Sequence, residues 1–116
     1  MGVYDVTQAN RLRWQRLAHE QVGRFLTDAP EHNLPAITWT VATTGAITGR
    51  VDGLGVTPEQ QRTAFEAWAA YLNVTPTERD HRDGSVTLHA HFERGLGVGG
   101  ALRADIAPPM TDEDGE

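Results

Sequence analysis

Two histidines two residues apart are the side chains of this sequence best placed to do chemistry. His89 and His91 lie in the alternating stretch 86–92, so they project to the same side of a predicted β-strand. Imidazole nitrogens bind Zn²⁺ and similar ions, and Asp105 or the more distant His81 is the candidate third ligand. No HExxH or other fixed ligand spacing accompanies the pair, so exposed strand histidines remain the alternative and no metal site is assigned.

Signatures of other chemistry are missing. The chain has no cysteine, which excludes disulfides, thiolate metal sites and cysteine nucleophiles. Its one serine, Ser85, follows Gly84 at a predicted turn, where a turn role explains it better than nucleophilic catalysis. The glycine-rich run 95–100 leads into a strand and lacks a following lysine, so it is a strand connection and not a phosphate loop. The sequence therefore predicts no catalytic residue and no cofactor.

Length and charge favour one globular domain that does not bind nucleic acid. The chain has 116 residues, and we expect a single domain over 1–108 followed by an acidic tail over 109–116. Four of its 16 acidic residues lie in that tail, which leaves 12 acidic residues against 10 basic ones in the body. A nearly neutral body lacks the basic surface that neutralises phosphates.

No segment directs the chain to a membrane or out of the cell. The N-terminus has no basic region followed by an apolar stretch, and no later segment approaches the ~20 apolar residues of a membrane span. Together with the absence of cysteine, this favours a cytoplasmic location.

Two amphipathic helices are predicted. Residues 8–27 place five apolar side chains on one arc, namely Trp14, Ala18, Val22, Phe25 and Leu26. The second helix starts at Thr57, which can cap it, with Pro58 at the first helical position and Gln60 completing a capping box. It continues to about Leu72.

Period-2 alternation predicts four strands, and a hairpin signal before the third of these predicts a fifth strand without apolar residues. Segments 36–42 and 46–52 form a first hairpin around Thr43-Thr44-Gly45. A polar edge strand over 77–82 and the strand 86–92 form a second, joined by a type I′ turn at Asp83-Gly84. A last strand ends at Ile106, and Gly49 within the second strand marks a place where a helix packs closely.

The element order α-β-β-α-β-β-β predicts an α+β fold, in which both helices cover one face of an antiparallel sheet of four to five strands. The buried face carries the apolar strand residues Ile37, Trp39, Val41, Ile47, Val51, Val86, Leu88, Phe92, Leu102 and Ile106. The opposite, open face carries nine polar residues, which we take as the candidate binding surface: Thr38, Thr40, Thr48, Arg50, Thr87, His89, His91, Arg103 and Asp105. Strand order remains open, since the sequence leaves undecided whether the two hairpins are neighbours or flank each other.

Several short motifs carry a resemblance. They are Leu34-Pro35, Trp39-Thr40-Val41, Thr44-Gly45, Gly49-Arg50-Val51-Asp52 and Ala64-Phe65-Glu66-Ala67-Trp68. With the histidine strand included, about two thirds of the chain resembles small uncharacterised proteins of high-GC actinobacteria, often linked to plasmids, prophages or integrative elements. The resemblance implies a mobile-element or regulatory context and brings no activity with it.

These observations favour a non-enzymatic interaction or regulatory module. We expect it to bind a protein partner through the open sheet face or an edge strand, and to form a homodimer that protects its sheet edges. The alternative is a small-ligand or metal-binding domain that uses His89, His91, Arg50 and Arg103 on the same face.

Overall fold

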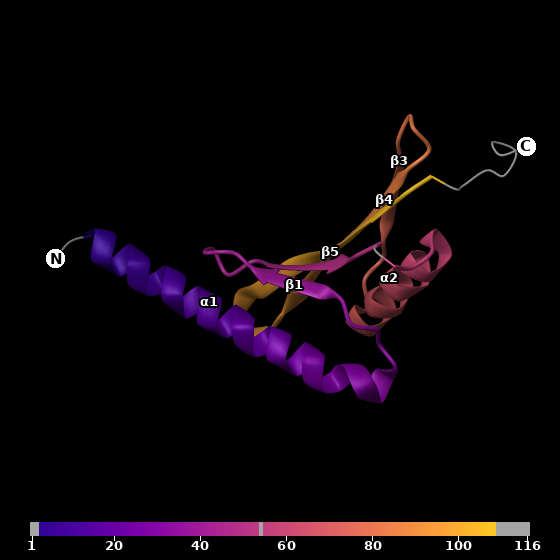
Figure 1. The fold of residues 1–116 in the computed structure, drawn as a ribbon. Helices are drawn as coiled ribbons and strands as arrows, with labels where there is room; N and C mark the ends of the chain where they lie inside the picture. The colour runs from indigo at the N-terminus through magenta and orange to yellow at the C-terminus, as the bar shows by residue number, and fades with distance from the viewer. Residues whose placement is uncertain (1–2, 54, 109–116) are drawn as a thin grey trace, which may run out of the picture.

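The computed structural model describes residues 3–53 and 55–108, and it has the predicted order of elements (Figure 1). The predicted acidic tail, 109–116, lies outside the described residues. The elements are α1 (Val3–Asp28), a short 3-10 turn (Ala29–His32), β1 (Thr38–Val41), β2 (Ile47–Val51), α2 (Pro58–Leu72), β3 (Thr77–Asp80), β4 (Val86–Arg94), a second 3-10 turn (Gly95–Gly97) and β5 (Val98–Ile106). The α+β class is confirmed.

The sheet is mixed, so the prediction of a purely antiparallel sheet is wrong. Its five strands lie in the order β1-β2-β5-β4-β3. The hairpin pairs and the β4–β5 pair are antiparallel, but β2 pairs with β5 in parallel. The reason is topological: β5 turns back along β4 and fills the gap between the two hairpins, which gives it the direction of β2. The two hairpins flank β5.

Gly100 makes the parallel pairing possible. A Cβ atom at this position would overlap the backbone carbonyl of Ile47, its register partner on β2. Sequence reasoning assigned Gly99 and Gly100 to the connection before the last strand, whereas β5 already begins at Val98. A glycine inside a strand marks a place where another backbone comes close, and that holds here.

Both hairpins turn by the same three-residue loop. Gly45 and Gly84 have φ angles of +85° and +89°, and each donates its backbone N–H to the carbonyl three residues earlier. The predicted type I′ turn at Asp83-Gly84 is wrong, because that turn needs a positive φ at both residues and Asp83 lacks it. The Asp83 carboxylate instead accepts hydrogen bonds from the Ser85 backbone N–H (2.9 Å) and hydroxyl (2.6 Å), which confirms Ser85 as a turn residue.

The two helical segments also end alike. Asn33 follows the short turn after α1, Asn73 follows α2, and both adopt left-handed φ angles, 56° and 59°. Each donates its N–H back to the preceding turn, and so does the apolar residue that follows it, Leu34 or Val74. At the start of α2 the predicted capping box around Thr57 is confirmed.

Both helices cover one face of the sheet, and the core lies between them and the strands. Phe25 of α1 sits at its centre, with ring centroids 5.1 Å from Trp39 and 6.1 Å from Trp68. The predicted α1 stripe is only partly buried, because Trp14 is 41% and Leu26 54% exposed. The N-terminal part of α1 extends past the sheet in Figure 1. Leu26 directly follows the core-facing Phe25, so it lies about 100° further around the helix.

The expected helix contact at Gly49 is also wrong. A Cβ atom there would meet the side chains of Ile37, Trp39 and Leu102, none of which belongs to a helix. Gly49 therefore makes room for side chains from its neighbouring strands on the buried face.

Gln61 of α2 is buried although sequence reasoning left it out of the core. Its amide Nε2 donates to the backbone carbonyls of Val51 on β2 (2.9 Å) and Asp105 on β5 (2.9 Å). One side chain thus ties the helix to both strands of the parallel pair and donates a hydrogen bond to a backbone carbonyl of each. Within the described residues, no helix has the length and apolar character needed to cross a membrane.

The close approach at Gly100 can be tested by mutation. We expect Gly100→Ala to lower the free energy of unfolding by about 3 kcal/mol or more, because the added methyl must push β5 away from Ile47. Urea denaturation followed by circular dichroism measures this. Gly95→Ala is the control, because a Cβ there meets nothing within 4 Å. Equal stability of the two variants would refute the steric role of Gly100.

Candidate functional site

The uncovered face of the sheet gathers the nine predicted binding residues into three adjacent rows. In the first row, Thr38, Arg50, Arg103 and His89 are register partners across β1, β2, β5 and β4. In the second, Thr40, Thr48 and His91 share a row with Ala101 of β5. Thr87 opposite Asp105 forms the third. The side-chain alternation was therefore predicted correctly.

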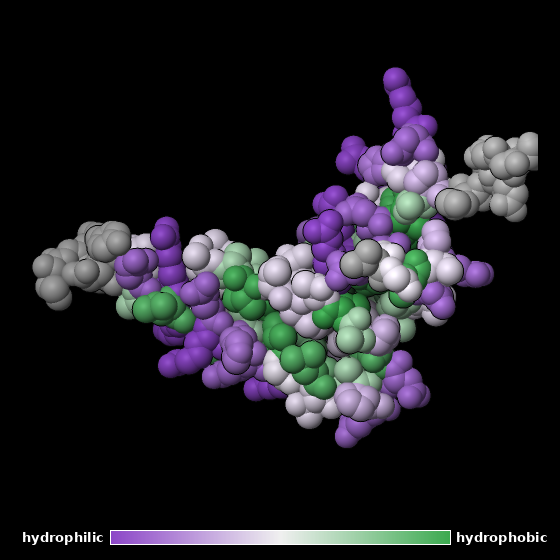
Figure 2. Space-filling model, viewed as in Figure 1, coloured by the Kyte–Doolittle hydropathy of each residue, from purple (hydrophilic) through white to green (hydrophobic). Residues whose placement is uncertain are grey.

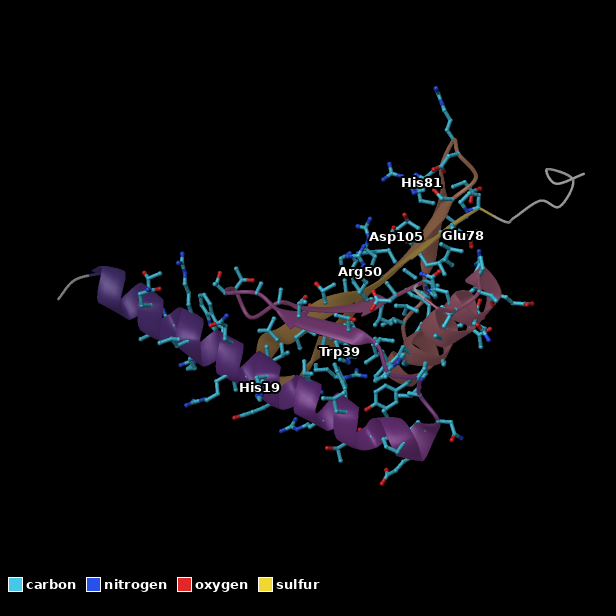
Figure 3. All side chains as sticks on the ribbon, in the orientation of Figure 1. His19, Trp39, Arg50, Glu78, His81 and Asp105 are labelled. Carbon is cyan, nitrogen blue, oxygen red and sulfur yellow. The ribbon has the colours of Figure 1, made fainter. Side chains whose placement is uncertain are left out.

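Asp105 is the centre of a polar network on this face (Figure 3). Its carboxylate accepts two hydrogen bonds from Arg103, from Nε at 3.1 Å and Nη2 at 3.2 Å, and lies 3.5 Å from Nη2 of Arg50. The Thr87 hydroxyl donates to the same carboxylate at 2.8 Å. His81 then contacts that hydroxyl through Nε2, also at 2.8 Å. Two arginines from different strands therefore share one carboxylate.

The network lowers the pKa of Asp105. The hydrogen bonds from Arg103 are the main cause of the low pKa, and the Thr87 hydroxyl and the charge of Arg50 act in the same direction, while partial burial opposes them. Asp105 is thus ionised at neutral pH and holds both guanidinium groups against the sheet. Because the Arg50 and Arg103 side chains are 59% and 51% exposed, they can still contact a partner.

His89 and His91 do lie together, as their spacing predicted. Their ring centroids are 4.5 Å apart in an edge-to-face arrangement. Burial lowers the pKa of His89 below its usual value, and the neighbouring His91 and Arg103 lower it further. His89 is therefore neutral at neutral pH and keeps a ring nitrogen able to accept a hydrogen bond or bind a metal.

The proposed third ligands are engaged elsewhere. Asp105 is held by Arg103 and Arg50, and His81 contacts Thr87. Within residues 3–53 and 55–108, no three His, Cys, Asp or Glu side chains come together in a way that could hold a metal ion. The histidine pair therefore offers two ligands, fewer than a structural or catalytic zinc site uses.

Hollows of the surface lie away from the polar network. One of about 500 Å³ lies between the β1 approach and α2, lined by Ile37, Val51 and Gln61 among others. Another, of about 760 Å³, lies between the start of α2 and the second hairpin. These two hollows and two others, of about 460 and 490 Å³, are not lined by Arg50, Arg103 or Asp105, although Thr38 lines the first and His91 lines another. Small-molecule sites are usually concave, and these four hollows provide none at the three charged residues.

Sequence reasoning missed two features of this face. It treated His81 only as a distant metal ligand, although the strand-end position of this residue places it beside Thr87. It also put Arg50 and Arg103 on one face without placing them side by side, because only the parallel β2–β5 pairing makes them register partners. The alternation in each strand was visible in the sequence, but no local signal gave the strand order.

Comparison with protein-family models, with curated proteins and with solved structures finds no match to this chain.

The network makes stability depend on pH. The folded-state pKa of Asp105 lies below its unfolded value, so its ion pairs stabilise the fold above the unfolded pKa and this contribution disappears as pH falls through the folded pKa. We expect Asp105→Asn to cost up to about 1 kcal/mol near neutral pH, since the site is screened by solvent, and almost nothing near pH 2. Urea unfolding across this pH range measures the difference. A pH-independent cost, or the same profile for Asp80→Asn, would contradict the role of the network.

Proposed function

We propose that this protein is a non-enzymatic interaction module that binds a partner protein through the open face of its sheet. The observation that carries the proposal is the Arg50–Asp105–Arg103 array, in which side chains from two strands are held in place on an uncovered surface. Arginines held by a carboxylate lose less side-chain freedom on binding than free ones. Arginine is also enriched among the residues that dominate protein–protein interfaces.

The shape of the surface supports a macromolecular partner. Arg50, Arg103 and Asp105 line none of the four hollows described above, and threonines surround the array on β1, β2 and β4. An array that lines no such hollow suits the broad contact of two proteins better than the enclosure of a small molecule.

The charge of the surface favours an acidic segment of the partner. Arg50 and Arg103 contact the Asp105 carboxylate, and Arg79 of β3 lies opposite Thr87, one strand further along the same row. A second carboxylate, that of Asp52, accepts a hydrogen bond from Thr38 at 2.6 Å at the other end of the open face. Three arginines are therefore gathered on the part of the face around Asp105, although the whole chain carries a formal charge of -6. A partner carboxylate can form bidentate hydrogen bonds with a guanidinium group, which gives direction as well as attraction. The mobile-element and regulatory context belongs to this proposal and rests on the resemblance of the sequence motifs.

Affinity capture tests the proposal. The tagged chain is incubated with a lysate of its source cells, beside an Arg50→Gln/Arg103→Gln variant that keeps side-chain length and removes both charges. We expect the wild type to retain a specific protein, and the variant to retain at least about tenfold less of it because the charged contacts are gone. Binding should also weaken as salt is raised.

The matched control removes two exposed arginines from α1, as Arg13→Gln/Arg24→Gln. This variant should capture the partner like the wild type, and circular dichroism should show that all three proteins are folded. Equal capture by the open-face variant, or no specific capture by any protein, would rule out this binding surface.

A second candidate function, metal or small-ligand binding, is favoured by the histidine pair alone. The two rings lie 4.5 Å apart and the low pKa of His89 keeps it neutral, so both histidines can coordinate an ion whose remaining ligands come from water or a partner.

Thermal denaturation with Zn²⁺ or Ni²⁺ separates the two functions. If the histidines bind metal in the isolated chain, either ion should raise the melting temperature of the wild type and leave His89→Ala/His91→Ala unchanged. An unchanged wild type, or an equal shift in both proteins, would exclude a metal site at this pair.

A further inference from the structure

The two edges of the sheet differ in charge. At one edge, β3 has the sequence Thr-Glu-Arg-Asp, all four residues are exposed, and Glu78 forms an ion pair with Arg62 of α2 at 3.0 Å. At the other edge, β1 has the sequence Thr-Trp-Thr-Val. No Asp, Glu, Lys or Arg occurs anywhere from residue 32 to residue 49. Charged side chains are a common protection against edge-to-edge pairing, and only the β3 edge has them.

The hairpin geometry determines which backbone groups β1 presents outward. The N–H of Ala42 donates to the carbonyl of Ala46 at 2.9 Å, so this is a hydrogen-bonded pair of the ladder. Because such pairs alternate along antiparallel strands, Thr40 and Thr38 direct their backbone groups toward β2. Trp39 and Val41, together with Ile37 before the strand, direct theirs away from the sheet. Among the described strands, β1 pairs with β2 alone.

We propose that this edge pairs with β1 of a second copy of the chain, antiparallel and centred on Trp39. In this register Trp39 faces its own counterpart, Ile37 faces Val41, and Thr38 faces Thr40 of the second copy. The outward N–H and C=O groups of these positions then form about six hydrogen bonds. The arrangement is an isologous two-fold contact, the commonest symmetry of protein dimers.

A second copy suits this edge because a two-fold axis brings like residues together. Any charge along β1 would face a like charge nearby, and like charges on opposed strands destabilise a sheet. Thr38 and Thr40 carry no charge and avoid this conflict. The Thr38 hydroxyl donates to the Asp52 carboxylate of its own chain at 2.6 Å, so its oxygen is left to accept a hydrogen bond from Thr40 of the second copy on the open face. On the other face, the half-buried indole of Trp39 would lie beside its copy. Figure 2 looks onto this side of the molecule, where hydrophobic atoms follow the line between α1 and β1.

The dimer would join two five-stranded sheets into one continuous sheet. Both open faces would then lie on the same side, so the two Arg50–Asp105–Arg103 arrays would form one extended surface. The inference does not rest on the proposed function, because it concerns the backbone edge and needs no partner protein.

The mass of the purified chain gives the first test. At about 50 μM, size-exclusion chromatography with light scattering and sedimentation velocity should give twice the 12.7 kDa of one chain. A single-chain mass at this concentration would overturn the proposal.

Two double variants test the register. Thr38→Lys/Thr40→Lys places lysine opposite lysine at both symmetric positions, and we expect at least a tenfold weaker dimer. Thr38→Lys/Thr40→Glu keeps the lysine beside Asp52, which Thr38 contacts in its own chain, and places lysine opposite glutamate across the two copies, so it should restore or strengthen association. If neither double variant changes the strength of the dimer, or if both weaken it equally, this pairing is contradicted.

Val41→Pro tests the edge without changing the open face. It removes a backbone N–H that points away from β2, so the folded chain keeps its own ladder but loses donors to the second copy. We expect this variant to be monomeric, with the circular dichroism of the wild type. Thr77→Lys on β3 is the control and should remain dimeric. A dimeric Val41→Pro, or a monomeric Thr77→Lys, would place the contact elsewhere and refute the proposal.

Discussion

The close approach of two backbones at Gly100 and Ile47 is the constraint on which the rest of this structure depends. The chain makes two hairpins, and neither hairpin contacts the other as a neighbour in the sheet. β5 joins them, because it pairs antiparallel with β4 and parallel with β2. Gln61 of α2 donates hydrogen bonds to the backbone carbonyls of Val51 and Asp105, one on each strand of the parallel pair. Without that pairing, the helices would have two separate hairpins to cover, and small two-stranded sheets are only marginally stable.

β5 also divides the molecule into two similar halves. Each half is a helix, a left-handed asparagine that ends the helical segment, and a hairpin with glycine at the last loop position. β5 is parallel to β2 and antiparallel to β4, so β2 and β4 run in opposite directions and the two hairpins do too. A two-fold axis that passes through β5, perpendicular to the sheet, would relate two hairpins arranged in this way. The halves differ at their outer edges, since β3 is charged and β1 is not. The architecture is nearly symmetric, and the surface chemistry is not.

This asymmetry connects the two proposals. Both helices occupy the same face of the sheet, so they leave the open face and the β1 edge uncovered. On the open face, one carboxylate orients two arginines that are far apart in the sequence. At the edge, uncharged residues leave backbone groups available for another strand. The two surfaces meet at Thr38 and Thr40, whose side chains belong to the open face and whose strand forms the edge.

The sequence by itself determined the elements and the face of each strand residue, because these depend on local periodicity, capping and turn residues. The capping box at Thr57, the outward set from Thr38 to Asp105 and the α+β class could all be predicted in this way. Sequence reasoning misplaced contacts that depend on distant partners, as at Gly49, and the burial of Trp14 and Leu26. Only the tertiary structure decided the strand order, and with it the mixed sheet, the pairing of Arg50 with Arg103 and the identity of the free edges. The physical reason is that strand order depends on which backbones can approach one another across the core, and no local pattern along the chain records that choice.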